Sequence, residues 1–263
     1  MSVEQLVQMN VLKSLDTSEV QEAFDSVTLV LYHIFPKQVG NGRLLVLEWR
    51  QCETYVQHIL HLCKRYYELK TRHSLTPTVE FAELISNCAW FLHKTGETDN
   101  CLAVLDMAKK CCDNHQGLVY AHLLNTLGCI YFGMNRMGLA RSNLAQSYRI
   151  RDLYLPPDNE ELLFTKSNLA NAESAEDNWQ EALRILNEVE DVRSKQGRES
   201  RVPLALTYLA KARAFCCLKE FAQAKFYCDK AMQILGKEYG PDGDHVSKCV
   251  LDSFLSAPEL ICE

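Results

Sequence analysis

Hydrophobic residues recur at helical spacing along almost the whole chain. From residue 76 onward, apolar positions three and four residues apart alternate with short polar turns, which predicts pairs of amphipathic helices. The predicted pairs cover about 78–94 with 98–113, 116–133 with 137–153, 159–175 with 179–195, and 201–217 with 221–237. Further helices are predicted over 3–15, 18–34 and 44–69 and near 243–255. The pattern therefore predicts an all-α fold.

The four predicted hairpins share one register. Small residues mark it at separations of 39, 42 and 42: Ala89, Gly128, Ala170 and Ala212. A second small residue follows twelve positions later, and a further repeat position sixteen later: Cys101, Ala140, Ala182 and Ala224, then Leu105, Leu144, Leu186 and Cys228. Two helices that cross closely need small residues at the contact and larger ones beside it. This period indicates stacked hairpins, which usually bind partners rather than perform chemistry.

The repeated pattern resembles the tetratricopeptide repeat (TPR), and its clearest copy runs from Leu124 to Tyr131. Glu173 stands where an aromatic residue is usual, and Lys211 where Leu is usual. The extra length between hairpins resembles the linkers of kinesin-light-chain-like repeats, and Asp158 is expected to cap the helix that follows it. The resemblance implies a right-handed superhelical solenoid of TPR hairpins, preceded by linker helices.

The chain is expected to divide into a helical linker region (1–75), four TPR-like repeats (76–240) and a capping helix with a tail (241–263). The strings Leu31–Pro36, Trp49–Cys52 and Tyr55–His58 resemble the segment after the winged helix in fungal signal-transduction ATPases with NB-ARC or NACHT motors. The phosphate-binding motif of such motors, G-x-x-x-x-G-K-[S/T], does not occur in the sequence. The resemblance implies the sensor part of a receptor-like ATPase, as a stand-alone paralogue or a truncated gene product.

Charge and cysteine content narrow the class of protein. A formal net charge of −6 argues against a general nucleic-acid binder. The 12 cysteines include no C-x2-C pair and many occupy apolar repeat positions, which predicts free, mostly buried thiols in a reducing compartment. Neither a signal-peptide pattern nor a membrane-length apolar stretch is visible. We therefore expect a cytoplasmic protein that binds neither nucleic acid nor membrane.

No arrangement of residues indicates catalysis. His58 and His61 lie one helical turn apart and are the best metal candidate, but no third ligand is apparent. The cysteines lack a local nucleophile signature, and the acidic clusters fall at predicted helix ends, where they cap or stay solvated. The sequence therefore predicts no catalytic residue, no metal and no cofactor.

The TPR resemblance places exposed positions of each first helix on a concave groove. These positions give the predicted partner-binding set Asn87, Trp90, Asn125, Asn168, Asn171 and Arg213. An Asn amide offers donors and an acceptor, so it can hold the backbone of an extended peptide, although Asn is also tolerated at any exposed position. Trp90 either anchors a partner or packs against the preceding long helix. The basic residues of the two-carboxylate clamp of co-chaperones are missing, which disfavours a heat-shock chaperone C-terminus as the partner.

The predicted function is a non-enzymatic protein–protein interaction scaffold that binds a peptide or a partner helix in the concave TPR groove. One alternative is a regulatory or self-association module that acts on a separate motor protein through apolar residues of the N-terminal helices. A remote alternative is an enzyme with an unrecognised site.

Overall fold

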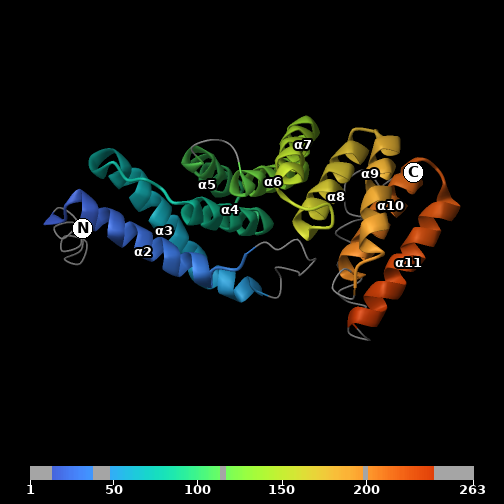
Figure 1. Cartoon of the computed structure of the whole chain (residues 1–263), viewed down its shortest axis with the longest axis horizontal. Coiled ribbons are helices and arrows are strands. Elements are labelled where there is room, and N and C mark those ends of the chain that lie inside the picture. Colours follow the sequence, from blue (N-terminus) through green and yellow to red (C-terminus); the bar gives the residue numbers. More distant parts are fainter. Residues whose placement is uncertain (1–13, 38–47, 113–116, 198–200, 240–263) are drawn as a thin grey trace. The chain divides into compact units, whose positions relative to one another are not determined.

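The computed structural model describes residues 14–37, 48–112, 117–197 and 201–239, which form ten α-helices and no strand (Figure 1). The helices are α2 (Thr17–Ile34), α3 (Trp49–His73), α4 (Val79–Lys94), α5 (Thr98–Cys111), α6 (Leu118–Gly133), α7 (Met137–Tyr154), α8 (Glu160–Ala175), α9 (Trp179–Arg193), α10 (Arg201–Cys217) and α11 (Phe221–Tyr239).

The helix bounds follow the hydrophobic pattern closely. All eight helices from α4 to α11 begin and end within about two residues of their predicted limits. The long N-terminal helix was placed less well, because α3 begins at Trp49 and continues to His73. The helices predicted over 3–15 and 243–255 lie outside the described residues. The three-part division of the chain at 75 and 240 stays a prediction.

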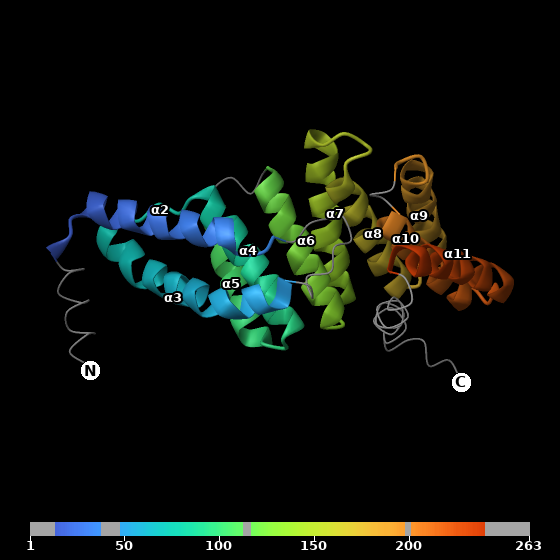
Figure 2. The same cartoon turned by 90° about the horizontal axis from the view of Figure 1, so that it is seen from below.

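The described residues form two compact units, which divide between Thr126 and Leu127 within α6. In the first unit α2 packs on α3, both contact α4, and α4 pairs with α5 (Figure 2). In the second unit each helix from α7 to α11 packs against the next. Each unit therefore buries its apolar residues between successive helices, as stacked hairpins do.

Two helix starts are fixed by side chains. Asp16 and Glu19 form a reciprocal capping box on α2, with both nitrogen–oxygen distances at 2.9 Å. At α8 the predicted cap, Asp158, is wrong: Asn159 Oδ1 accepts from the Glu161 N–H at 2.9 Å instead. Asn159 directly precedes the first helical residue, so its side chain reaches the amides of the first turn.

The four hairpins share one turn geometry. Seven residues after each register mark stands a residue with positive φ: Gly96 (82°), Asn135 (57°), Asp177 (61°) and Lys219 (62°). The amide of the next residue then bonds the carbonyl five residues back, as from Glu97 N to Leu92 O at 2.9 Å. This is the Schellman arrangement, in which a left-handed residue ends a helix and satisfies its last carbonyls. The turn recurs at separations of 39, 42 and 42 even though four different residue types form it.

The expected close helix contact is confirmed at Gly128. A Cβ added at Gly128 would lie 2.5 Å from Leu144 Cγ and 3.2 Å from the Ala140 carbonyl oxygen. Ala140 is fully buried, and Leu144 is buried to 1% exposure. The branched Cγ of Leu144 and the α7 backbone cannot both move aside cheaply, so only glycine fits at this crossing of α6 and α7.

We expect Gly128→Ala to destabilise the protein by about 1–3 kcal/mol, because it overpacks this contact. The matched control is Gly138→Ala, since a Cβ there meets only Glu176 Oε1 at 3.7 Å. The control should be neutral or stabilising by up to about 1 kcal/mol, because alanine favours a helix more than glycine does. Urea unfolding followed by circular dichroism measures both. If Gly128→Ala matched the wild type, α6 and α7 would not cross as closely as described.

Candidate partner-binding surface

Two of the predicted groove residues are not exposed. Asn87 on α4 is 4% exposed and Asn125 on α6 is 1% exposed. Asn87 Nδ2 donates to the carbonyl of Glu83, one turn earlier, at 2.9 Å. The expectation that these amides face solvent is therefore wrong. The physical reason for Asn87 is that α4 contacts α2, α3 and α5, which leaves little of its surface open.

Trp90 on α4 is half-buried. Its ring lies 5.9 Å from that of His93, and Lys94 Nζ sits 4.7 Å from its centroid, so both contacts come from its own helix. The aromatic contact between α4 and α3 is made by Phe91 with Trp49, at 5.2 Å between ring centroids. Trp90 keeps a partly open face, and its role as an anchor stays a prediction.

The remaining predicted residues come together in the second unit. Asn168 and Asn171 on α8 and Arg213 on α10 are all half-buried. Arg213 Nη2 donates to Asn171 Oδ1 at 3.1 Å, and the Arg213 guanidinium carbon lies 6.0 Å from the ring centroid of Phe132 on α6. We call Phe132, Asn168, Asn171 and Arg213 the A-helix strip, because they lie on the first helices of three successive hairpins.

The strip has a definite hydrogen-bonding character. Because Asn171 Oδ1 accepts from Arg213, the Asn171 side chain presents its amide N–H donors to a ligand. Phe132 adds a half-buried aromatic surface next to these donors. The arrangement suits a ligand with carbonyl or carboxylate acceptors beside an apolar side chain. Sequence reasoning missed Phe132, since the matching positions in the other repeats are His93, Ser174 and Cys216.

The A helices of this unit are held by two buried arginines, which we call the arginine latches. Arg151 ends α7 and Arg193 ends α9, 42 residues apart, with exposures of 2% and 3%. Arg151 Nη1 donates to Thr165 Oγ1 at 2.5 Å and to the Glu161 carbonyl at 2.8 Å. Each latch therefore joins the second helix of one hairpin to the first helix of the next.

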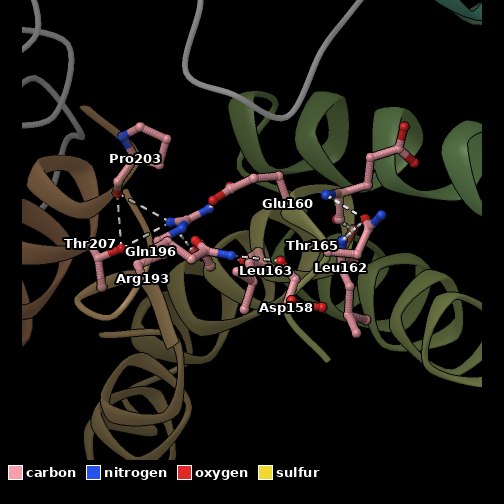
Figure 3. A network of polar contacts seen from close by, with 12 residues as sticks. Asp158, Glu160, Leu162, Leu163, Thr165, Arg193, Gln196, Pro203 and Thr207 are labelled. Carbon is pink, nitrogen blue, oxygen red and sulfur yellow. Dashed lines mark hydrogen bonds and ion pairs between the residues drawn. The ribbon is translucent and has the colours of Figure 1, made fainter. Parts of the chain in front are cut away.

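The second latch repeats the first. Arg193 Nη1 donates to Thr207 Oγ1 at 2.9 Å and to the Pro203 carbonyl at 3.2 Å (Figure 3). Thr207 follows Thr165 by 42 residues, the same separation as the two arginines. Sequence reasoning missed this motif, although the shared spacing of Arg and Thr was visible.

Carboxylates balance the charge of both latches. Glu161 Oε2 lies 3.3 Å from Arg151 Nη2, and Glu160 Oε2 lies 3.0 Å from Arg193 Nη2. Burial lowers the pKa of both guanidiniums, while these carboxylates act to raise it. Arginine stays protonated in proteins, so each latch is a buried, charged network.

The two departures from the repeat pattern are also polar contacts between helices. Lys211 is 2% exposed, forms an ion pair with Glu190 and donates to the Tyr227 hydroxyl at 2.8 Å. Glu173 accepts from Asn178 Nδ2 at 2.9 Å. Arg141 Nη1 lies 3.6 Å from the Glu173 carboxylate. The buried charges at both positions are therefore paired, as a folded protein requires.

The described residues offer little reactive chemistry. They contain no cluster of three or more metal-ligating side chains, and His58 and His61 are exposed on α3. Ten described cysteines are free, and five of them are half-buried rather than buried. Burial raises the pKa of the Cys63 and Cys101 thiols to about 12. Such thiols stay protonated at neutral pH and are poor nucleophiles.

Membrane insertion finds no support in the helices that the structure describes: none combines the length and the apolar character that crossing a bilayer requires.

Neither a protein-family model nor a curated protein matches the sequence. Solved structures do resemble the fold. The TPR-like repeats of a putative kinesin light chain from Podosopora anserina align over 76% of this chain and 98% of theirs, with a TM-score of 0.57 at 17% identity. BtubC (BKLC) from P. vanneervenii aligns over 82% of this chain and 91% of its own, with a TM-score of 0.56 at 13% identity.

A third similar structure is aspartyl phosphate phosphatase F from Bacillus subtilis. It aligns over 79% of this chain and 55% of its own, with a TM-score of 0.56 at 13% identity. Such low identities establish the fold and not the function. The chain is all-α and has the fold of TPR-like helical repeat solenoids.

We expect a double-mutant cycle with Arg151→Met and Thr165→Val to report a coupling of roughly 1–3 kcal/mol, since the two side chains share a buried charged hydrogen bond. Arg184→Met is the control: Arg184 pairs only with Glu181 and Glu188 of its own helix and is 58% exposed, so its loss should change stability little. Chemical unfolding supplies all the free energies. A coupling near zero would mean that the latch does not hold α7 against α8.

Proposed function

We propose that this chain is a non-enzymatic protein-interaction scaffold that binds a peptide or a partner helix across the A-helix strip. The observation that carries the proposal is the contact of Arg213 with both Asn171 and Phe132, which brings groove positions from α6, α8 and α10 into one half-exposed cluster. The cluster presents amide donors beside an aromatic ring, which suits the backbone carbonyls and one apolar side chain of a bound segment.

The arginine latches support this proposal because they limit motion within the second unit. Arg151 ties α7 to α8 and Arg193 ties α9 to α10, so the helices that carry the strip are positioned before a partner arrives. Binding to a positioned surface loses less conformational entropy than binding to a mobile one. Asn87 and Asn125 would need a local opening to reach a ligand, since both are buried.

A finer proposal concerns the setting of the scaffold. The strings at 31–36, 49–52 and 55–58 support the sensor part of a fungal receptor-like ATPase, because they resemble the segment that follows the winged helix there. The free cysteines of the described residues support a reducing, cytoplasmic location. A motor ATPase among the captured partners is the outcome expected from this setting.

The strip is tested by photo-crosslinking. We expect p-benzoylphenylalanine in place of Phe132 to crosslink a partner in a lysate of the native organism, and the same probe in place of Leu153, which is 81% exposed on α7, to capture none. Adding Asn171→Ala and Arg213→Ala should lower the yield at least about tenfold, since each lost tenfold in affinity corresponds to about 1.4 kcal/mol. The proposal fails if both probe positions capture the same proteins or if the added substitutions leave the yield unchanged.

Self-association is a second candidate function, favoured by an apolar patch on α2. Val27, Leu29 and Val30 are 48%, 44% and 60% exposed. Val27 and Val30 line a hollow of about 510 Å³ together with His58 and His61 of α3. An apolar patch of this kind is a common site of association.

For this candidate, sedimentation velocity should show a dimer that forms with rising protein concentration. Val27→Ser with Val30→Ser should return the protein to the monomer, because it removes the apolar contact. Leu153→Ser, at another exposed position, should leave the dimer intact. A wild-type chain that stays monomeric at high micromolar concentration would exclude self-association through α2.

A further inference from the structure

A second open feature of the C-terminal unit is a polar pocket formed by α9, the residues after it, α10 and α11. Its volume is about 460 Å³. Arg193, Ser194, Gln196, Arg201, Lys237 and Glu238 supply its polar lining, and Leu204 and Ile234 supply apolar wall. The pocket lies apart in sequence from the A-helix strip and shares no residue with it.

The lining carries an excess of positive charge. It contains three cationic side chains and one carboxylate. Arg201 Nη1 pairs with Glu238 Oε1 at 3.1 Å across α10 and α11. Lys237 is exposed, and no carboxylate of the described residues lies within ion-pair distance of it. The pocket therefore holds one ammonium group that no protein charge balances, and an anion would be attracted to it.

A buried donor lies at the same place. Arg193 is 3% exposed, and its two terminal nitrogens bond Thr207, Pro203 and Glu160. Its Nε–H has no hydrogen-bond partner among the described residues. A buried donor without a partner costs roughly 1–3 kcal/mol, so a ligand that accepts from it would gain that much.

Comparison with the preceding repeat separates this pocket from a general property of the fold. Arg151, 42 residues before Arg193, also leaves its Nε–H without a partner. However, the positions 42 residues before Ser194 and Arg201 are Asp152 and Asn159. An acidic and a neutral residue thus replace the hydroxyl and the guanidinium, and only the latch at Arg193 is joined by further cations.

We propose that this pocket binds an oxyanion, a carboxylate or phosphate group, carried by an organic body that contacts Leu204 and Ile234. Arg201 and Lys237 supply the charge, Arg193 Nε–H and the Ser194 hydroxyl supply donors, and the apolar wall receives the rest of the ligand. Charged hydrogen bonds of this kind are the strong ones, and guanidinium groups match the geometry of both anions. The proposal does not depend on the A-helix strip.

The test is a nuclear magnetic resonance titration of the full-length chain at constant ionic strength. Inorganic phosphate, phenyl phosphate and benzoate are the three probes. The signals followed are the Arg193 Nε–H and the backbone amides of Gln196 and Gly197. We expect saturable shifts at millimolar or lower concentration, with phenyl phosphate or benzoate binding more tightly than inorganic phosphate because of the apolar wall. Tighter phenyl phosphate identifies the phosphate source, and tighter benzoate the carboxylate source.

Two variants make the result decisive. Arg201→Gln with Lys237→Gln should weaken binding at least tenfold, and both residues are exposed, so the fold should persist. Arg184→Gln with Lys225→Gln removes the same charge from exposed positions of α9 and α11 away from the pocket and should leave binding unchanged. Shifts that do not saturate, or equal weakening by both variants, would overturn the proposal in favour of non-specific charge attraction.

Discussion

The packing of the C-terminal unit depends on the arginine latches. Arg151 and Arg193 each carry a buried charge from the end of one hairpin to a threonine and a carbonyl at the start of the next. In repeat proteins, stability is approximately the sum of the repeats and of the interfaces between neighbours. A charged network at an interface permits one register only, because any slip would leave a buried guanidinium without its acceptors. The positions of α8 and α10, and with them the A-helix strip, follow from that register.

Apolar periodicity was sufficient to predict the fold. The limits of α4 to α11, and the need for glycine at the contact of Gly128 with Leu144, follow from spacing and side-chain size. The latches could not be predicted in this way, since Arg151 and Arg193 stand at helix C-termini, where a surface arginine is also favourable. Their burial depends on Thr165 and Thr207, fourteen residues later in each case, and hydrophobic periodicity carries no information about such polar pairs.

The candidate site was predicted only in part for the same reason. Asn168, Asn171 and Arg213 were placed on the surface correctly, whereas Asn87 and Asn125 are buried. A helical pattern indicates which residues face the nearest partner helix. It does not indicate how many helices contact the other faces, and α4 has three such neighbours. The functional surface is thus set by the tertiary arrangement of the hairpins more than by the repeat pattern itself.

The central claim is that the A-helix strip contacts the partner, and hydrogen–deuterium exchange with mass spectrometry tests it most directly. The full-length chain is compared alone and bound to the partner that is crosslinked through position 132. The account predicts slower amide exchange on binding in residues 129–133 of α6, 166–171 of α8 and 209–213 of α10, with little change in α2. Protection confined to α2 and α3, with none in these three segments, would contradict it.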